Sequence, residues 1–130
     1  MIYIVDTHAW IEYFLGSKYG LILKKLIGDR NNKLITMECS LAELWGYCSK
    51  NNVVFNRIYD IVKRNSFVLP VLTNHWIKAA KIRFEMRRKV KDFGLIDAIL
   101  VAKQNELKCA IVSGDPHFKS LKNVVYIGEK

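Results

Sequence analysis

Short apolar runs alternate along this chain with longer segments in which apolar residues recur every three or four positions. The short runs predict β-strands at residues 2–5, 34–37, 67–71, 109–112 and 124–127. The periodic segments predict helices at residues 9–15, 21–27, 40–48, 53–62, 75–91 and 95–107, with a short helix after Pro116. Strands that alternate with helices indicate parallel strands joined by right-handed crossovers. We therefore expect a three-layer α/β/α sandwich around a central, mostly parallel sheet of four to five strands.

Local signals refine some of these elements. Pro70 places the strand at 67–71 at an edge of the sheet or near the end of the strand. Ser40 and Glu43 have the spacing of a capping box at the start of a helix. Thr73 and Asn74 are suited to cap the long basic helix that follows.

The length and composition fit one domain that spans residues 1–130, because a chain of 130 residues with 51% hydrophobic residues can bury a single core. The apolar runs are short and interrupted by charge, and the first run, Met1–Val5, leads to Asp6 without any basic residue. We therefore expect neither a signal peptide nor a membrane span. The cysteines, Cys39, Cys48 and Cys109, are odd in number and form no C-x-x-C pair, which favours a reduced, cytoplasmic protein.

The net charge changes the picture of possible partners. A formal charge of +9 and an isoelectric point near 9.6 attract polyanions, and nucleic acid is the first to consider. Basic residues crowd the segment 78–91. The candidates for RNA binding in it are Arg83, Arg87, Arg88, Lys89 and Lys91. A solvated helix face explains any single basic run equally well, and charge alone does not distinguish RNA from DNA.

Four acidic residues stand apart because each lies beside or just after an apolar segment: Asp6, Glu43, Asp97 and Asp115. In an α/β sheet the carboxyl ends of parallel strands open into one crevice, so these acids can meet although they are distant in sequence. Clustered carboxylates repel one another, and a divalent metal ion relieves this repulsion. Such a metal site activates water and stabilises charge in phosphodiester hydrolysis.

Each acid also has an ordinary structural explanation. Asp6 and Asp115 can be helix N-caps, the latter followed by Pro116 at the first helical position. Glu43 can belong to its capping box, and Asp97 can be a first-turn acid that faces water. Taken singly, each of these explanations is the better one. Taken together, the placement of the acids at one crevice favours a shared site.

Four segments that contain these acids resemble the signature segments of PIN-domain ribonucleases. They are Val5-Asp6-Thr7, Leu41-Ala42-Glu43-Leu44, residues 95–102 (LIDAILVA) and residues 112–118 (VSGDPHF). The resemblance runs over essentially the whole chain, and no single segment is specific, but their order and spacing are. In its short length the chain is most similar to VapC-type toxins of prokaryotic toxin–antitoxin pairs.

This resemblance implies an endoribonuclease whose acidic pocket binds Mg²⁺ or Mn²⁺. By position, Asp6 and Asp97 would be direct ligands, Asp115 a ligand or an acid hydrogen-bonded to one, and Glu43 a ligand or a water-orienting base. Thr7 and Ser113 match positions of supporting hydroxyl groups. The resemblance also implies an RNA substrate, a homodimer and a small antitoxin that blocks the pocket.

Other functions stay open on the sequence. The chain can be a PIN-like module that binds RNA or protein without cutting it, or an RNA-processing nuclease without an antitoxin. A phosphatase or receiver domain fits poorly, because the second early acid that these proteins need is missing and His8 stands in its place. His8 and His117 can touch substrate phosphate, but a lone histidine near a strand end is more often structural. The tryptophans at positions 10, 45 and 76 are expected in the core or in a subunit interface.

Overall fold

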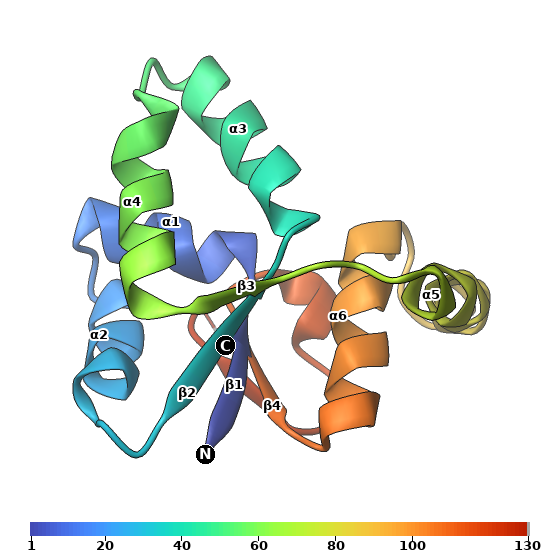
Figure 1. Cartoon of the computed structure of the whole chain (residues 1–130). Helices are drawn as coiled ribbons and strands as arrows, with labels where there is room; N and C mark the ends of the chain where they lie inside the picture. The colour runs from blue at the N-terminus through green and yellow to red at the C-terminus, as the bar shows by residue number, and fades with distance from the viewer. Residues whose placement is uncertain (130) are drawn as a thin grey trace.

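A computed structural model describes residues 1–129, and five parallel strands form its central sheet (Figure 1). The strands are β1 (Ile2–Val5), β2 (Lys33–Met37), β3 (Phe67–Leu69), β4 (Ala110–Ser113) and β5 (Val124–Tyr126). Their order across the sheet is β3-β2-β1-β4-β5, so β1 lies in the centre between β2 and β4. The expected sheet of parallel strands is confirmed.

Helices cover both faces of the sheet. They are α1 (Thr7–Leu15), α2 (Gly20–Gly28), α3 (Ser40–Lys50), α4 (Phe55–Asn65), α5 (Thr73–Met86) and α6 (Leu95–Leu107), with a short 3₁₀ helix η1 (Pro116–Phe118). The cores show that α1 to α4 pack on one face and that α5 and α6 pack on the other. Figure 1 shows the two groups on opposite sides of the strands.

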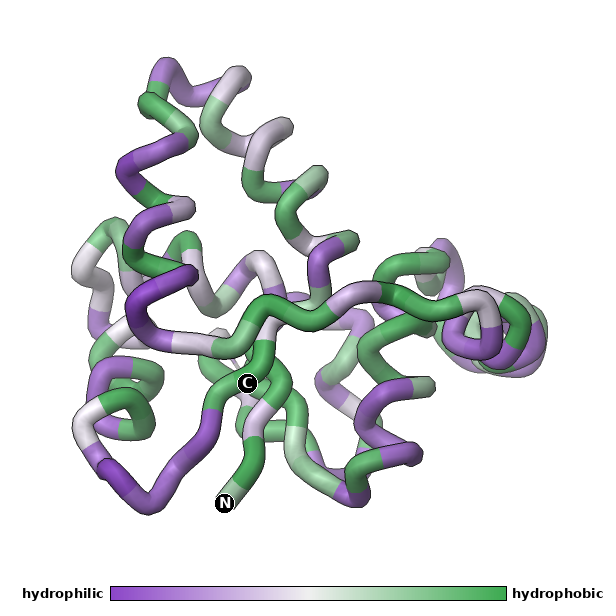
Figure 2. The backbone as a smooth tube through the Cα atoms, in the orientation of Figure 1, coloured by the Kyte–Doolittle hydropathy of each residue, from purple (hydrophilic) through white to green (hydrophobic). Residues whose placement is uncertain are grey.

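The continuous apolar character of the strands follows from this double coverage. Val5 and Val112 point into the core beneath α1 and α3, whereas Ile4 and Ile111 point into the core beneath α5 and α6. Since successive side chains of a strand point to opposite faces, a strand buried on both faces needs apolar residues at every position. The strands are accordingly mostly hydrophobic along their length in Figure 2.

The helix caps expected at Ser40 with Glu43 and at Thr73 with Asn74 are wrong. Ser40 is the first residue of α3 after the N-cap Cys39, and its buried Oγ atom has no hydrogen-bond partner in the described part of the chain. The carboxylate of Glu43 instead accepts a hydrogen bond from Thr7. In α5 the N-cap is Leu72, and its backbone N–H donates to Nδ1 of His75 at 3.0 Å. The imidazole nitrogen here takes the place of the Glu or Gln oxygen that accepts a hydrogen bond from the N-cap N–H in a capping box.

The end of one helix also needs correction. Helix α5 ends at Met86 rather than near residue 91, and the chain then turns, with Asp92 in the left-handed region at φ 64°. Trp10 is fully buried, but Trp45 and Trp76 are 59% and 43% exposed, so these two do not belong to the core of a single chain. Within residues 1–129, no helix has the length and apolar character required to cross a bilayer.

Two glycines provide a test of packing between α1 and α2. A Cβ atom at Gly20 would lie 2.3 Å from the carbonyl oxygen of Glu12, whereas a Cβ atom at Gly46 in α3 would meet nothing within 4 Å. We predict that Gly20→Ala lowers the free energy of unfolding by about 1–3 kcal/mol, because a backbone contact must shift. Gly46→Ala, the matched control, should raise it by about 0.5–1 kcal/mol, because alanine favours a helix interior. Chemical denaturation measures both, and equal effects of the two variants would contradict this account.

Candidate active site

Asp6 and Asp115 follow the neighbouring strands β1 and β4 at the carboxyl edge of the sheet. The hydroxyl group of Ser113 lies between them: it donates to Oδ2 of Asp6 at 2.6 Å and accepts from the backbone N–H of Asp115 at 3.0 Å. The pairing of β1 with β4 brings these three residues together. Both acids also cap helices, because Asp6 accepts from the N–H of Thr7 and Asp115 accepts from the N–H of His117.

Glu43 reaches the same place from the first turn of α3. Its Oε1 atom accepts a hydrogen bond of 2.8 Å from the hydroxyl group of Thr7, whose backbone N–H binds Oδ1 of Asp6 at 2.8 Å. Thr7 therefore holds Asp6 and Glu43 side by side. Asp6 is almost completely buried, whereas Glu43 is exposed to solvent. Of these two acids, Glu43 has the better access to water and to a substrate.

Asp97 comes from the first turn of α6, on the other face of the sheet. Its Oδ2 atom accepts from the N–H of Gly94 at 3.2 Å and lies 2.9 Å from Nδ1 of His117. The side chain is only 10% exposed, so the explanation of Asp97 as an acid that faces water is wrong. It faces the cluster instead.

His117 is the residue that sequence reasoning left without a role. Its Nδ1 atom lies 2.9 Å from Asp97 and 3.7 Å from Oδ1 of Asp115. Donor atoms of Asp97, Asp115 and His117 all lie within 4.8 Å of one another. The only signal for this in the sequence is the Asp-x-His spacing, which does not reveal that Asp97 lies opposite.

His8 has a different position. Its exposed side chain packs against the turn after β4, where a Cβ atom at Gly114 would come within 2.8 Å of Nδ1 of His8 and 2.9 Å of the carbonyl oxygen of Ile127. A glycine is required here because there is no room for a side chain. His8 does not belong to the group of donor atoms around Asp97.

The proximity of the acids changes their pKa values. Burial, together with the smaller effect of the charges of the other three acids, raises the pKa of Asp6 to about 7, against the hydrogen bond from Ser113. Burial also raises the pKa values of Glu43 and Asp97, and nearby carboxylates add to both shifts. The hydrogen bond with Asp97 raises the pKa of His117. The surroundings of the four acids therefore disfavour the full set of negative charges that these acids carry in water.

A divalent cation fits this donor set. Carboxylate oxygens and an imidazole nitrogen are ligands of divalent metals, and a bound cation removes the repulsion that raises these pKa values. Hydrogen bonds from Ser113, Thr7 and Gly94 fix the carboxylates in place. The residues with donor atoms close enough for one ion are Asp97, Asp115 and His117.

The basic residues predicted for RNA binding lie at the end of α5 and in the segment that leads into α6. Arg87, Arg88, Lys89 and Lys91 are exposed and Arg83 is half-buried. Arg87 donates from Nε to the carbonyl oxygen of Phe93 at 2.9 Å, and the ring of Phe93 packs against His117. Arg87 therefore lies close to the candidate site, whereas Arg88 and Lys89 line a hollow together with Val101 and Asn105 of α6.

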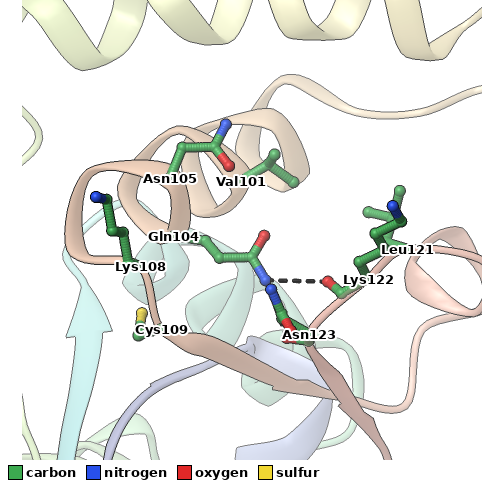
Figure 3. A pocket seen from close by; sticks show the side chains of 8 residues that line it. All are labelled: Val101, Gln104, Asn105, Lys108, Cys109, Leu121, Lys122 and Asn123. Carbon is green, nitrogen blue, oxygen red and sulfur yellow. Dashed lines mark hydrogen bonds between the residues drawn. The ribbon is translucent and has the colours of Figure 1, made fainter.

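The acids do not line the pocket drawn in Figure 3. That pocket, of about 410 Å³, lies at the opposite end of α6, where Gln104 donates hydrogen bonds to the carbonyl oxygens of Lys122 and Asn123 (Figure 3). It contains no acidic residue among those that line it. The candidate site is an open acidic edge of the sheet and is separate from this pocket.

Comparisons with known proteins give consistent results. The model of the PIN domain family matches residues 3–124. No curated protein sequence matches the chain significantly. Similar solved structures include VapBC2 from Rickettsia felis bound to a promoter DNA fragment, with 20% identity over 97% of both chains and a TM-score of 0.71.

Two other structures are similar over nearly their whole length. VapC20 of Mycobacterium tuberculosis, described as a toxin that cleaves the sarcin–ricin loop, has 17% identity over 94% of this chain and 96% of its own, with a TM-score of 0.75. DNA-bound VapBC from Salmonella typhimurium has 17% identity over 95% of both chains and a TM-score of 0.67. At these identities the likeness establishes a shared fold.

The raised pKa of Asp6 predicts a pH dependence of stability in metal-free protein. The folded chain holds the Asp6 proton up to about pH 7, whereas the unfolded chain releases it near the ordinary aspartate pKa of 3.8. The contribution of Asp6 to the free energy of unfolding is therefore largest below about pH 4 and is lost as the pH rises through 7. Asp6→Asn cannot ionise, so we expect it to gain, relative to the parent, on the order of 2 kcal/mol between pH 5 and pH 8. Denaturant titrations in a chelator measure this gain.

The matched control for this experiment is Asp60→Asn, since Asp60 is exposed and, within residues 1–129, its one ion pair is with Lys63. It should show no such gain between the two pH values. A pH profile of Asp6→Asn that is parallel to that of the parent would show that Asp6 does not ionise near neutral pH in the folded protein.

Proposed function

The chain belongs to the PIN domain family, and from this premise we propose that it is a metal-dependent endoribonuclease. The observation that carries the proposal is the meeting of four acids from four separate segments at one edge of the sheet. Asp6, Glu43, Asp97 and Asp115 match, one for one, the acids of the resemblance described above. Their mutual effect on pKa values supports a site whose purpose is to hold a cation.

In this proposal the acids have distinct tasks. Asp97 and Asp115 hold the ion, and Asp6, fixed by Ser113 and Thr7, contributes negative charge from the buried side. When bound, Mg²⁺ or Mn²⁺ supplies positive charge that activates water and stabilises the phosphodiester transition state.

Glu43 is suited to orient the attacking water and to accept its proton. Glu43 is exposed as a residue although its carboxyl group is partly buried, and Thr7 holds one of its oxygen atoms. Its raised pKa supports this role, because a general base works best when its pKa is near the working pH.

The substrate that we propose is RNA. The exposed basic residues Arg87, Arg88, Lys89 and Lys91 supply cations in the segment that leads into α6 and Asp97, and the net charge of +9 attracts a polyanion over long range. The Mycobacterium tuberculosis toxin of the same fold, described as cleaving the sarcin–ricin loop, supports this choice. An RNA substrate also implies a cytoplasmic protein.

We further propose that the protein is the toxin of a toxin–antitoxin pair and that it forms a homodimer. Several similar structures are VapBC complexes, which supports a small antitoxin as partner. Exposed apolar side chains are available for protein contacts in two places. Trp45 and Val54 are 59% and 64% exposed around α3 and α4, and Trp76, Ile77 and Phe84 are 43%, 62% and 69% exposed on α5.

A non-catalytic PIN-like binding module is the alternative function. It does not need a metal ion, so calorimetry with Mn²⁺ distinguishes the two. Heat of binding at submillimolar Mn²⁺ favours the nuclease, and no heat at millimolar Mn²⁺ favours the binding module.

The nuclease proposal predicts a strict requirement for the acids. Asp97→Asn and Asp6→Asn keep the shape of the side chain but remove the anionic oxygen that a hard cation needs. We expect each to fold and to lose at least about 100-fold in metal-dependent RNA cleavage, since such an ion contributes several kcal/mol to the transition state. Cleavage of total RNA, followed on gels, measures this, with Asp60→Asn as the control that should cut like the parent. Undiminished cleavage by Asp97→Asn would exclude this acidic site.

The proposed RNA surface predicts a change in salt dependence. Replacing both Arg88 and Lys89 by glutamine should reduce the slope of log K against log salt concentration by about 1.4, since each phosphate contact to a single strand contributes about 0.7. Anisotropy titrations of Asp97→Asn protein in a chelator measure binding without cleavage. The control replaces Lys24 and Lys25, two exposed lysines of α2 on the other face of the sheet, by glutamine. An equal reduction of the slope in the control would mean that RNA binding depends on net charge and not on this surface.

A further inference from the structure

We infer that His117 is a direct metal ligand through Nδ1, and that this nitrogen makes the site select a transition-metal ion of the Mn²⁺ class over Mg²⁺. The inference rests on the proposed metal-dependent nuclease and deepens it, because it names the ion and a ligand that the four acids do not include. It begins from the three donor atoms of Asp97, Asp115 and His117.

The spacing of these donors fits one ion. Nδ1 of His117 lies 2.9 Å from Oδ2 of Asp97 and 3.7 Å from Oδ1 of Asp115. Adjacent ligand atoms around an ion with metal–ligand bonds of about 2.1 Å lie roughly 3 Å apart, and wider pairs lie nearer 4 Å. All three side chains can therefore contact a common ion with little movement.

The imidazole is held in this orientation by its surroundings. His117 lies in η1, where its backbone N–H is bound by the carboxylate of Asp115. Its ring packs against Phe93, a fully buried residue, with 6.1 Å between ring centroids. The side chain is 30% exposed, as is that of Asp115, so the group is open to solvent on one side for water or a substrate phosphate.

A purely orienting role for the ring is redundant. Asp97 is already oriented by the N–H of Gly94, and Asp115 by the backbone N–H of His117 itself. Removal of the imidazole would leave both carboxylates with these backbone donors. What the ring adds is a nitrogen atom that faces two carboxylates, which is the arrangement of a mixed nitrogen and oxygen ligand set.

A nitrogen ligand changes the preference among metal ions. Mg²⁺ favours an octahedral shell of oxygen atoms and retains several waters, whereas imidazole favours transition-metal ions, whose affinity rises from Mn²⁺ towards Co²⁺ and Ni²⁺. A site of carboxylates alone discriminates less between Mg²⁺ and Mn²⁺. Replacement of the nitrogen should therefore lower the affinity for Mn²⁺ more than the affinity for Mg²⁺.

The test measures metal binding in the full chain without reference to activity. Chelator-stripped protein is titrated with Mn²⁺ and with Mg²⁺ by calorimetry, and the Mn²⁺ complex is examined by pulsed electron paramagnetic resonance for coupling to a ligand nitrogen. Isotopic labelling of histidine assigns the coupling to imidazole. The variants are His117→Asn, whose amide N–H can keep the hydrogen bond to Asp97, and His8→Asn, a matched control at a histidine outside the donor group.

We expect nitrogen coupling in the parent and in His8→Asn, and its loss in His117→Asn. The ratio of Mn²⁺ affinity to Mg²⁺ affinity should fall about 10-fold or more in His117→Asn alone. If the parent protein binds Mn²⁺ and its resonance spectrum shows no coupling to a histidine nitrogen, the inference is overturned. This outcome does not depend on whether the variants fold. Coupling that persists in folded His117→Asn also overturns it.

A separate RNA cleavage assay distinguishes failure of this inference from failure of the proposed function. Metal-dependent cleavage by a parent protein without nitrogen coupling refutes the histidine ligand and leaves the nuclease intact. Absence of Mn²⁺ binding, with no cleavage in any divalent ion, refutes both.

Discussion

Electrostatic repulsion between carboxylates is the constraint on which the rest of this structure depends. The parallel pairing of β1 with β4 places Asp6 and Asp115 at adjacent strand ends, and the first turns of α3 and α6 add Glu43 and Asp97. Four acids in so small a space are tolerable when hydrogen bonds, together with a retained proton or a bound cation, offset their charges. The hydroxyl groups of Thr7 and Ser113 and the backbone N–H of Gly94 supply the first kind of compensation. The proposed cation site and the fold are therefore parts of one arrangement.

The structural and chemical explanations of these acids turn out to be compatible. Asp6 caps α1 and Asp115 caps η1, as the local sequence suggests, while the same carboxylates face the cluster. A cap fixes the position of a carboxylate relative to the backbone, because its oxygen must meet an N–H group of the first helical turn. A short side chain that is fixed in this way is well suited to a site that needs its charges in defined places.

The sequence predicts the parallel sheet and singles out the four acids, but it does not predict details that depend on tertiary contacts. The strand at residues 2–5 is predictable because burial on both faces demands apolar residues throughout. The cap assigned to Ser40 and Glu43 fails because Thr7, distant in sequence, takes the carboxylate. The position of His117 is likewise set by the meeting of η1 with the start of α6, for which no local pattern exists. The helical spacing of Trp45 and Trp76 predicts burial in the core or in a subunit interface, and spacing alone does not reveal which side of a helix the rest of the chain leaves uncovered.

The central position of β1 has a consequence for biosynthesis. The first strand of this domain to leave the ribosome is flanked in the finished sheet by β2 and by β4, and β4 is followed by the last of the four acids. In a growing chain β1 therefore lacks one of its two neighbours until β4 has been translated. Since Ser113 and Asp115 come with that strand, the acidic edge forms only after β4 has been made, and a chain that stops before β4 lacks this edge.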